Sequence, residues 1–106
     1  MSFIPIAKLV DIPDGQKLTI RVEGIDLLIC HHKQKIYVIE NVCPHQKKEL
    51  TEGRMRNGKI ICPFHGYAFN LSDGVSSIKN ANCNLTVFPS DCKDGIIRVK
   101  INLGEC

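Results

Sequence analysis

Short alternations of apolar and polar residues run along this sequence, and they predict β-strands connected by turns. Residues 16–22 alternate polar and apolar side chains, the pattern of a strand with one buried face. Two apolar runs rich in β-branched residues, 25–30 and 35–39, are separated by four polar residues and predict a hairpin. The dipeptide Asn57-Gly58, with short apolar pieces on both sides, predicts a second hairpin.

The remaining periodic segments also favour strands. Residues 85–88 and 96–101 are apolar and β-branched, and Asp94-Gly95 predicts the turn before the second of them. No segment keeps a 3.6-residue apolar period over three turns, and the best candidate for a helical turn is 7–12. We therefore predict an all-β fold.

The stretch from Val42 to about Gly74 differs from both of its flanks. It contains Pro44, Pro63 and four glycines, and its apolar residues are broken into short pieces. Proline and glycine interrupt regular structure and mark loops. We expect a site built from loops and inserted into a β scaffold.

Length, composition and charge limit the classes to which this protein can belong. The chain of 106 residues has the size of one domain, with 43% hydrophobic and 24% charged residues. No apolar run is long enough for a transmembrane helix, and the first residues do not have the pattern of a secretory signal, so we expect a cytoplasmic protein without membrane contact. A net charge of +3 without a basic block gives little support to nucleic-acid binding.

The cysteines carry the strongest chemical signal. Two compact motifs, Cys43-Pro44-His45 and Cys62-Pro63-Phe64-His65, are separated by residues 46–61. Thiolate and imidazole together suit zinc or iron–sulfur chemistry, whereas calcium and magnesium prefer oxygen ligands. Zinc fingers usually present a pair of cysteines and then a pair of histidines. Here each motif supplies one cysteine and one histidine.

This double motif resembles that of the Rieske family, in which Cys-x-His is followed after a similar spacer by Cys-x-x-His. The resemblance extends to the flanks 50–53 and 69–74 and implies one [2Fe–2S] cluster. It also implies that Cys43 and Cys62 hold one iron and that His45 and His65 hold the other, so that these four are the cofactor-binding and metal-ligating residues. The alternative is zinc in the same four ligands, or a chain without a metal.

The resemblance also implies an architecture. We expect one Rieske domain over 1–106, a small antiparallel β sandwich with an inserted cluster-binding subdomain. The subdomain spans 42–73, and the base comprises 1–41 and 74–106.

Departures from the respiratory members of the family indicate a low reduction potential. Those members have a bracing disulfide, but the corresponding positions here, Lys47 or its neighbour in the first loop and Phe64 in the second, are not cysteines. They also have Ser and Tyr hydroxyls that donate hydrogen bonds to cluster sulfurs, where this chain has Tyr67 and Phe69. Fewer donors stabilise the reduced cluster less. We expect a potential near the low end of the Rieske range, about −150 to 0 mV.

Other residues invite a chemical interpretation. Lys47 and Lys48, close to His45, form either a solvated basic turn or a patch that steers an acidic redox partner. Adjacent His31 and His32 point to opposite faces of a strand end, and we expect them in a surface turn. The remaining four cysteines are expected to be free thiols in a reducing compartment: Cys30, Cys83, Cys92 and Cys106.

The leading functional hypothesis is a Rieske ferredoxin that passes single electrons from a reductase to a terminal oxygenase, such as an aromatic-ring dioxygenase. The chain has no glycine-rich dinucleotide motif and no second iron site, so we expect an electron carrier without catalytic residues. The alternatives are the small subunit of an assimilatory nitrite reductase and a non-redox zinc or metal-free β module that binds a partner.

Overall fold

The computed structural model describes residues 3–43, 49–63, 67–76 and 84–101. Ten short strands and one single-turn 3₁₀ helix, η1 (Leu9–Asp11), make up the regular structure of these residues. The strands are β1 (Ile4–Lys8), β2 (Lys17–Val22), β3 (Ile25–His32), β4 (Lys35–Glu40), β5 (Arg54–Arg56), β6 (Lys59–Ile61), β7 (Ala68–Asn70), β8 (Val87–Phe88), β9 (Ser90–Lys93) and β10 (Ile96–Val99). No helix in these ranges has the length and apolar character needed to cross a membrane.

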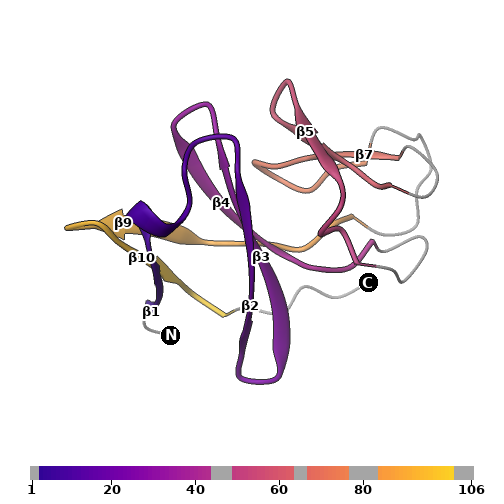
Figure 1. The fold of residues 1–106 in the computed structure, drawn as a ribbon. Coiled ribbons are helices and arrows are strands. Elements are labelled where there is room, and N and C mark those ends of the chain that lie inside the picture. The colour runs from indigo at the N-terminus through magenta and orange to yellow at the C-terminus, as the bar shows by residue number, and fades with distance from the viewer. Residues whose placement is uncertain (1–2, 44–48, 64–66, 77–83, 102–106) are drawn as a thin grey trace.

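The strands form three antiparallel sheets (Figure 1). A terminal sheet has the order β1-β10-β9, a central sheet the order β2-β3-β4-β8, and a third sheet the order β5-β6-β7. Figure 1 shows the terminal sheet at one end of the molecule and the β5-β6-β7 sheet at the other. The predicted all-β class is confirmed.

The central sheet is buried on both faces, and β3 shows why. Leu27 and Ile29 point into a core shared with the terminal sheet, where Ile97 also lies. Leu28 and Cys30 alternate with them and point into a second core, shared with the β5-β6-β7 sheet. Side chains of a strand alternate between faces, so a strand buried on both sides has a continuous apolar run. This explains the unbroken apolar run at 27–30, where four successive side chains are buried.

The turns that the sequence predicts are present. Asn57-Gly58 connects β5 and β6, and both residues have positive φ, 51° and 78°. Asp94-Gly95 connects β9 and β10 in the same way. Such left-handed pairs are the hairpin turns whose twist matches that of the flanking strands.

Some elements differ from the prediction. The helical turn expected at 7–12 is only the single 3₁₀ turn η1, because the preceding residues pair with β10 as β1. The sequence pattern did not predict β1, β7 or β9. β1 contains a proline and β9 is mainly polar, and both are edge strands of the terminal sheet, where one side of the backbone needs no partner.

Candidate metal centre

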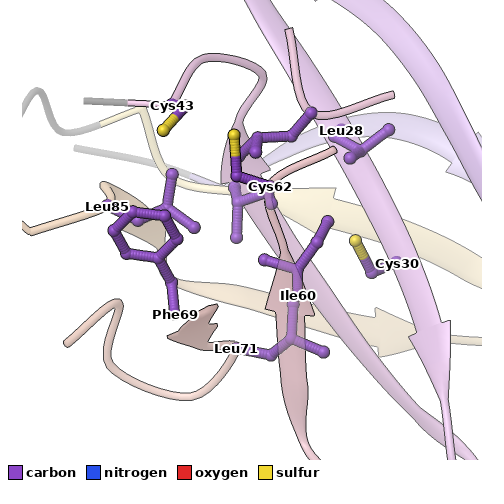
Figure 2. Close-up of a cluster of buried hydrophobic side chains, with 10 residues drawn as sticks. Leu28, Cys30, Cys43, Ile60, Cys62, Phe69, Leu71 and Leu85 are labelled. Atoms are coloured by element: carbon purple, nitrogen blue, oxygen red, sulfur yellow. The ribbon is translucent and has the colours of Figure 1, made fainter. Parts of the chain in front are cut away.

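The two cysteines of the double motif lie in the same buried cluster. Cys43 follows β4 and Cys62 follows β6 directly, and their exposed fractions are 0% and 1%. Both belong to the core between the central and β5-β6-β7 sheets. Figure 2 shows their sulfur atoms at one end of this core, with Phe69 and Leu85 beneath them. The fold thus places two thiols from different loops of the sequence in one core.

The two histidines of the motif, His45 and His65, lie outside the described residues, as do Lys47 and Lys48. Within the ranges that the structure describes, no group of three or more His, Cys, Asp or Glu side chains is arranged to hold a metal ion. The structure therefore gives the positions of the two cysteines, and the expected set of four ligands stays a prediction.

Asn41 forms hydrogen bonds to residues on the far side of the first motif, which begins at Cys43. This side chain is the buried polar one among the described residues, at 4% exposure. Its Oδ1 accepts the backbone N–H of Leu50 at 2.9 Å, and its Nδ2 donates to Oγ1 of Thr51 at 2.9 Å and Oε1 of Glu49 at 3.4 Å. One amide thus connects the residue two positions before Cys43 to residues 49–51.

At the second motif, a backbone hydrogen bond joins Cys62 to Tyr67. The N–H of Cys62 donates to the carbonyl of Tyr67 at 2.7 Å, which continues the β6–β7 pairing of Ile61 with Ala68. Cys62 and Tyr67 are therefore held opposite each other at the end of the β6–β7 hairpin. Because a strand end is rigid, it places the Cys62 side chain accurately.

Gly53 allows the backbone to lie close to strand β6, which precedes Cys62. A Cβ at Gly53 would lie 2.6 Å from the carbonyl oxygen of Ile61, the residue before Cys62. No larger residue fits there without moving β6. The carbonyl of Gly53 also accepts a hydrogen bond from Nζ of Lys17 at 2.8 Å, which links this segment to β2 of the central sheet.

A third cysteine, Cys30, belongs to the same core but has a different chemical state. Burial raises the pKa of its thiol to about 12, and the nearby Lys17 ammonium offsets only part of that effect. Metal ligation by cysteine needs the thiolate. Cys30 therefore remains a neutral core thiol, and Figure 2 shows it apart from the Cys43 and Cys62 sulfurs. Cys92 is exposed, and both are free, as predicted.

The prediction for His31 and His32 is wrong in one respect. Both residues belong to β3, and the turn consists of Lys33 and Gln34, which have positive φ. His31 is hydrogen-bonded through Nδ1 to the carbonyl of Ile12 at 2.7 Å. His32 accepts the N–H of Gly58 at Nε2, at 3.0 Å, and so connects the central sheet to the β5–β6 turn.

The donor set fits an iron–sulfur cluster. The two buried thiols, Cys43 and Cys62, belong to one core together with the buried apolar side chains of Phe69, Leu71 and Leu85. Soft sulfur ligands in an apolar setting select thiophilic metals and clusters, and the apolar shell influences the redox potential.

Comparison with known proteins identifies the family. The model of the Rieske [2Fe-2S] domain matches residues 2–89. The chain belongs to the Rieske family. This confirms the predicted family, and the domain implies the predicted [2Fe–2S] cluster.

Individual relatives agree with this assignment. Over 103 residues the chain is 27% identical to the ferredoxin component of a naphthalene 1,2-dioxygenase system from Pseudomonas putida, covering 97% of each chain. It is 33% identical to ferredoxin CarAc from Metapseudomonas resinovorans over 74% of each chain. Both relatives are ferredoxins, in agreement with the prediction of an electron carrier.

Solved structures give the same result for the fold. The ferredoxin of carbazole 1,9a-dioxygenase from Nocardioides aromaticivorans IC177 superimposes with a TM-score of 0.83 at 20% identity, covering 93% of this chain and 97% of that one. A chain in a complex of reduced oxygenase and oxidised ferredoxin of carbazole 1,9a-dioxygenase has a TM-score of 0.81 at 28% identity, with coverages of 92% and 100%.

Proposed function

We propose that this protein is a one-electron carrier, a Rieske ferredoxin that passes electrons from a reductase to a terminal oxygenase. The observation that carries the proposal is the shared burial of Cys43 and Cys62 in a chain whose relatives, along nearly its whole length, are ferredoxin components of oxygenase systems. Another relative is the ferredoxin component of an alkene monooxygenase system from Xanthobacter autotrophicus, at 26% identity. The carrier is therefore a substrate of enzymes and is not itself a catalyst.

The ligand set of this proposal comprises Cys43 and Cys62 on one iron and His45 and His65 on the other. A [2Fe–2S] cluster, when bound, supplies the capacity to accept and release a single electron. The chain contributes four ligands and a wall of apolar side chains. The Asn41 hydrogen bonds and the Cys62–Tyr67 backbone bond support the two ligand loops.

The division of the chain is part of the same proposal. Segment 42–73 forms the cluster-binding subdomain, and segments 1–41 and 74–106 form the base of a single Rieske domain over 1–106. Two contacts that tie the parts together support it: His32 accepts from Gly58, and Lys17 donates to Gly53.

The proposed partners are a ferredoxin reductase and a terminal oxygenase, in the cytoplasm. A structural relative is found in a complex of reduced oxygenase and oxidised ferredoxin, which supports docking to an oxygenase. Lys47 and Lys48, close to His45 in the sequence, are proposed to attract an acidic surface of such a partner.

The direct test is cofactor analysis of anaerobically purified protein. We expect two irons and two acid-labile sulfides per chain, no zinc, and uptake of one electron. Cys43→Ser, Cys62→Ser, His45→Ala and His65→Ala should each lose the visible spectrum of the cluster, whereas the matched control Cys92→Ser, at an exposed thiol, should keep it.

Three results would contradict the proposal. Zinc in place of iron, or a colourless protein, would identify a non-redox β module. Tight co-purification with one large partner that reduces nitrite would favour the small subunit of an assimilatory nitrite reductase. A fully retained cluster in either histidine variant would exclude that histidine from the ligand set.

A further inference from the structure

One face of the β5-β6-β7 sheet carries several basic side chains that the candidate metal centre does not use. Arg54 pairs with Ile61 across β5 and β6, and Ile61 pairs with Ala68 across β6 and β7. Residues directly opposite each other in antiparallel strands point to the same face. The face defined in this way, which we term the outer face, consists of Arg54, Arg56, Lys59, Ile61, Ala68 and Asn70.

The opposite face of this sheet is the one that packs. Ile60 and Phe69 are fully buried in the core, and Met55 packs against it. Since side chains alternate along a strand, the outer face points away from this core. Arg54 and Arg56 are exposed, and the other four residues of the outer face are half-buried. The outer face is therefore a sheet surface that the described part of the chain leaves uncovered.

The outer face carries three positive charges and no carboxylate. The described structure shows no ion pair for Arg54, Arg56 or Lys59. Arg21 and Arg98, in contrast, form ion pairs with aspartates on the adjacent strand, Asp26 and Asp91 respectively. Three unpaired cations on one small sheet produce a positive potential that attracts an acidic surface and repels a basic one.

The outer face also reaches the candidate metal centre. Ile61 is the residue directly before Cys62, and Ala68 lies opposite it on β7. These two residues give the face a small apolar part next to the centre, with Arg54 directly opposite Ile61 on β5 and with Arg56 and Lys59 further along the hairpin. Protein interfaces combine an apolar contact region with charges that orient the partner and accelerate its approach.

We propose that the outer face is a docking surface for an acidic surface of the redox partner protein. This inference rests on the proposed function, because a partner on this face would exchange an electron with the centre beside it. It adds a second basic surface, on strands β5 and β6, to the one proposed at Lys47 and Lys48. Arg54 and Arg56 steer the partner, and Ile61 and Ala68 contact it.

The test measures electron transfer from the reduced holoprotein to two small protein acceptors of opposite charge. Acidic plastocyanin and basic cytochrome c are mixed with it in a stopped-flow instrument. Arg54→Glu/Arg56→Glu is compared with Lys8→Glu/Lys93→Glu, an equal charge reversal at exposed positions of the terminal sheet at the other end of the molecule. The neutral pair Arg54→Gln/Arg56→Gln provides a milder variant of the same site.

At about 10 mM salt, where charges act over about 30 Å, we expect Arg54→Glu/Arg56→Glu to reduce plastocyanin at least about fivefold more slowly than the Lys8→Glu/Lys93→Glu control. Cytochrome c should react faster with this variant, the glutamine pair should give a smaller change of the same sign, and salt should remove the differences.

Equal rates for the two reversed variants, or for the glutamine pair and the wild type, would overturn the docking proposal while leaving the proposed function intact. A wild-type protein that reduces neither acceptor would instead overturn the proposed function, and the docking proposal with it.

Discussion

Among single residues, Asn41 has the most consequential contacts near the candidate centre. Replacing it with alanine leaves the buried N–H of Leu50 without its acceptor and removes the bond to Thr51. A buried donor that loses its partner costs about 1–3 kcal/mol. We predict that Asn41→Ala lowers the free energy of unfolding by this amount and loosens the loop that carries Cys43. Urea denaturation, monitored by circular dichroism, measures the first effect.

The control for this prediction is Asn84→Ala, at an exposed position that has no such hydrogen bonds in the described structure. It should change the unfolding free energy by less than about 0.5 kcal/mol. Equal stability of the two variants would show that the Asn41 hydrogen bonds do not hold the first loop.

Cys30 gives a prediction about pH. The folded-state pKa of its thiol is raised from the ordinary 9.0 to about 12 by burial. Between these values the unfolded chain releases the proton and the folded chain keeps it, so the folded state loses stability as pH rises, by up to about 1.4 kcal/mol per pH unit. Below pH 9 the thiol is neutral in both states and contributes no slope.

The check is urea denaturation of the wild type and of Cys30→Ala from pH 8 to pH 10.5. The wild type should lose stability more steeply above pH 9 than the variant, which lacks the buried thiol. Parallel pH profiles for the two proteins would contradict the assigned ionisation of Cys30.

At the scale of single residues the sequence indicates candidate ligands, but it does not indicate the residues that support them. Cys43 and Cys62 are identified by a motif, because a metal centre requires given residue types at given spacings. Nothing local marks Asn41 or His32, since their roles depend on partners such as Leu50 and Gly58 that only folding brings near. His45, Lys47 and Lys48 of the first motif and His65 of the second lie outside the described residues and stay predictions.

Between elements, the turn at 71–75 passes close to Leu85, two residues before β8. Gly74 has φ +78°, and a Cβ there would lie 1.9 Å from the carbonyl oxygen of Leu85. The N–H of Leu85 donates to the carbonyl of Gly74 at 2.9 Å, so the two backbones cannot separate without losing a hydrogen bond. We predict that Gly74→Ala destabilises the fold by more than about 3 kcal/mol, combining clash and left-handed strain.

A matched control is available at Gly24, which has φ +80° but no atom within 4 Å of an added Cβ. Gly24→Ala should cost only the backbone strain, about 1–2 kcal/mol. Thermal unfolding of both variants separates the two contributions, and equal melting temperatures would contradict the close approach at Leu85.

The elements that the sequence predicted are those with strong local signals. β2 has a clean alternation, and the hairpins at Asn57-Gly58 and Asp94-Gly95 have turn residues suited to positive φ. β1 and β9 were not predicted, because an edge strand buries few side chains and its pairing is determined by β10. Short β7 is likewise defined by its pairing with β6.

For the whole molecule, three sheets stack so that the central one is covered on both faces, with the two candidate ligand cysteines in one of the two cores. The order of layers could not be read from the sequence, because it depends on which face of each strand meets which neighbour. The continuous apolar run of β3 was the local sign of this double burial.

The central claim is that this chain carries single electrons at the low end of the Rieske range. Film voltammetry of the purified holoprotein from pH 6 to pH 10, with the visible spectrum recorded alongside, tests it most directly. We predict one reversible one-electron wave at about −150 to 0 mV, nearly independent of pH around neutrality, because the chain has Tyr67 and Phe69 where respiratory members have a Ser and a Tyr whose hydroxyls donate to cluster sulfurs. A potential well above about +150 mV, or a colourless protein without a wave, would contradict the account.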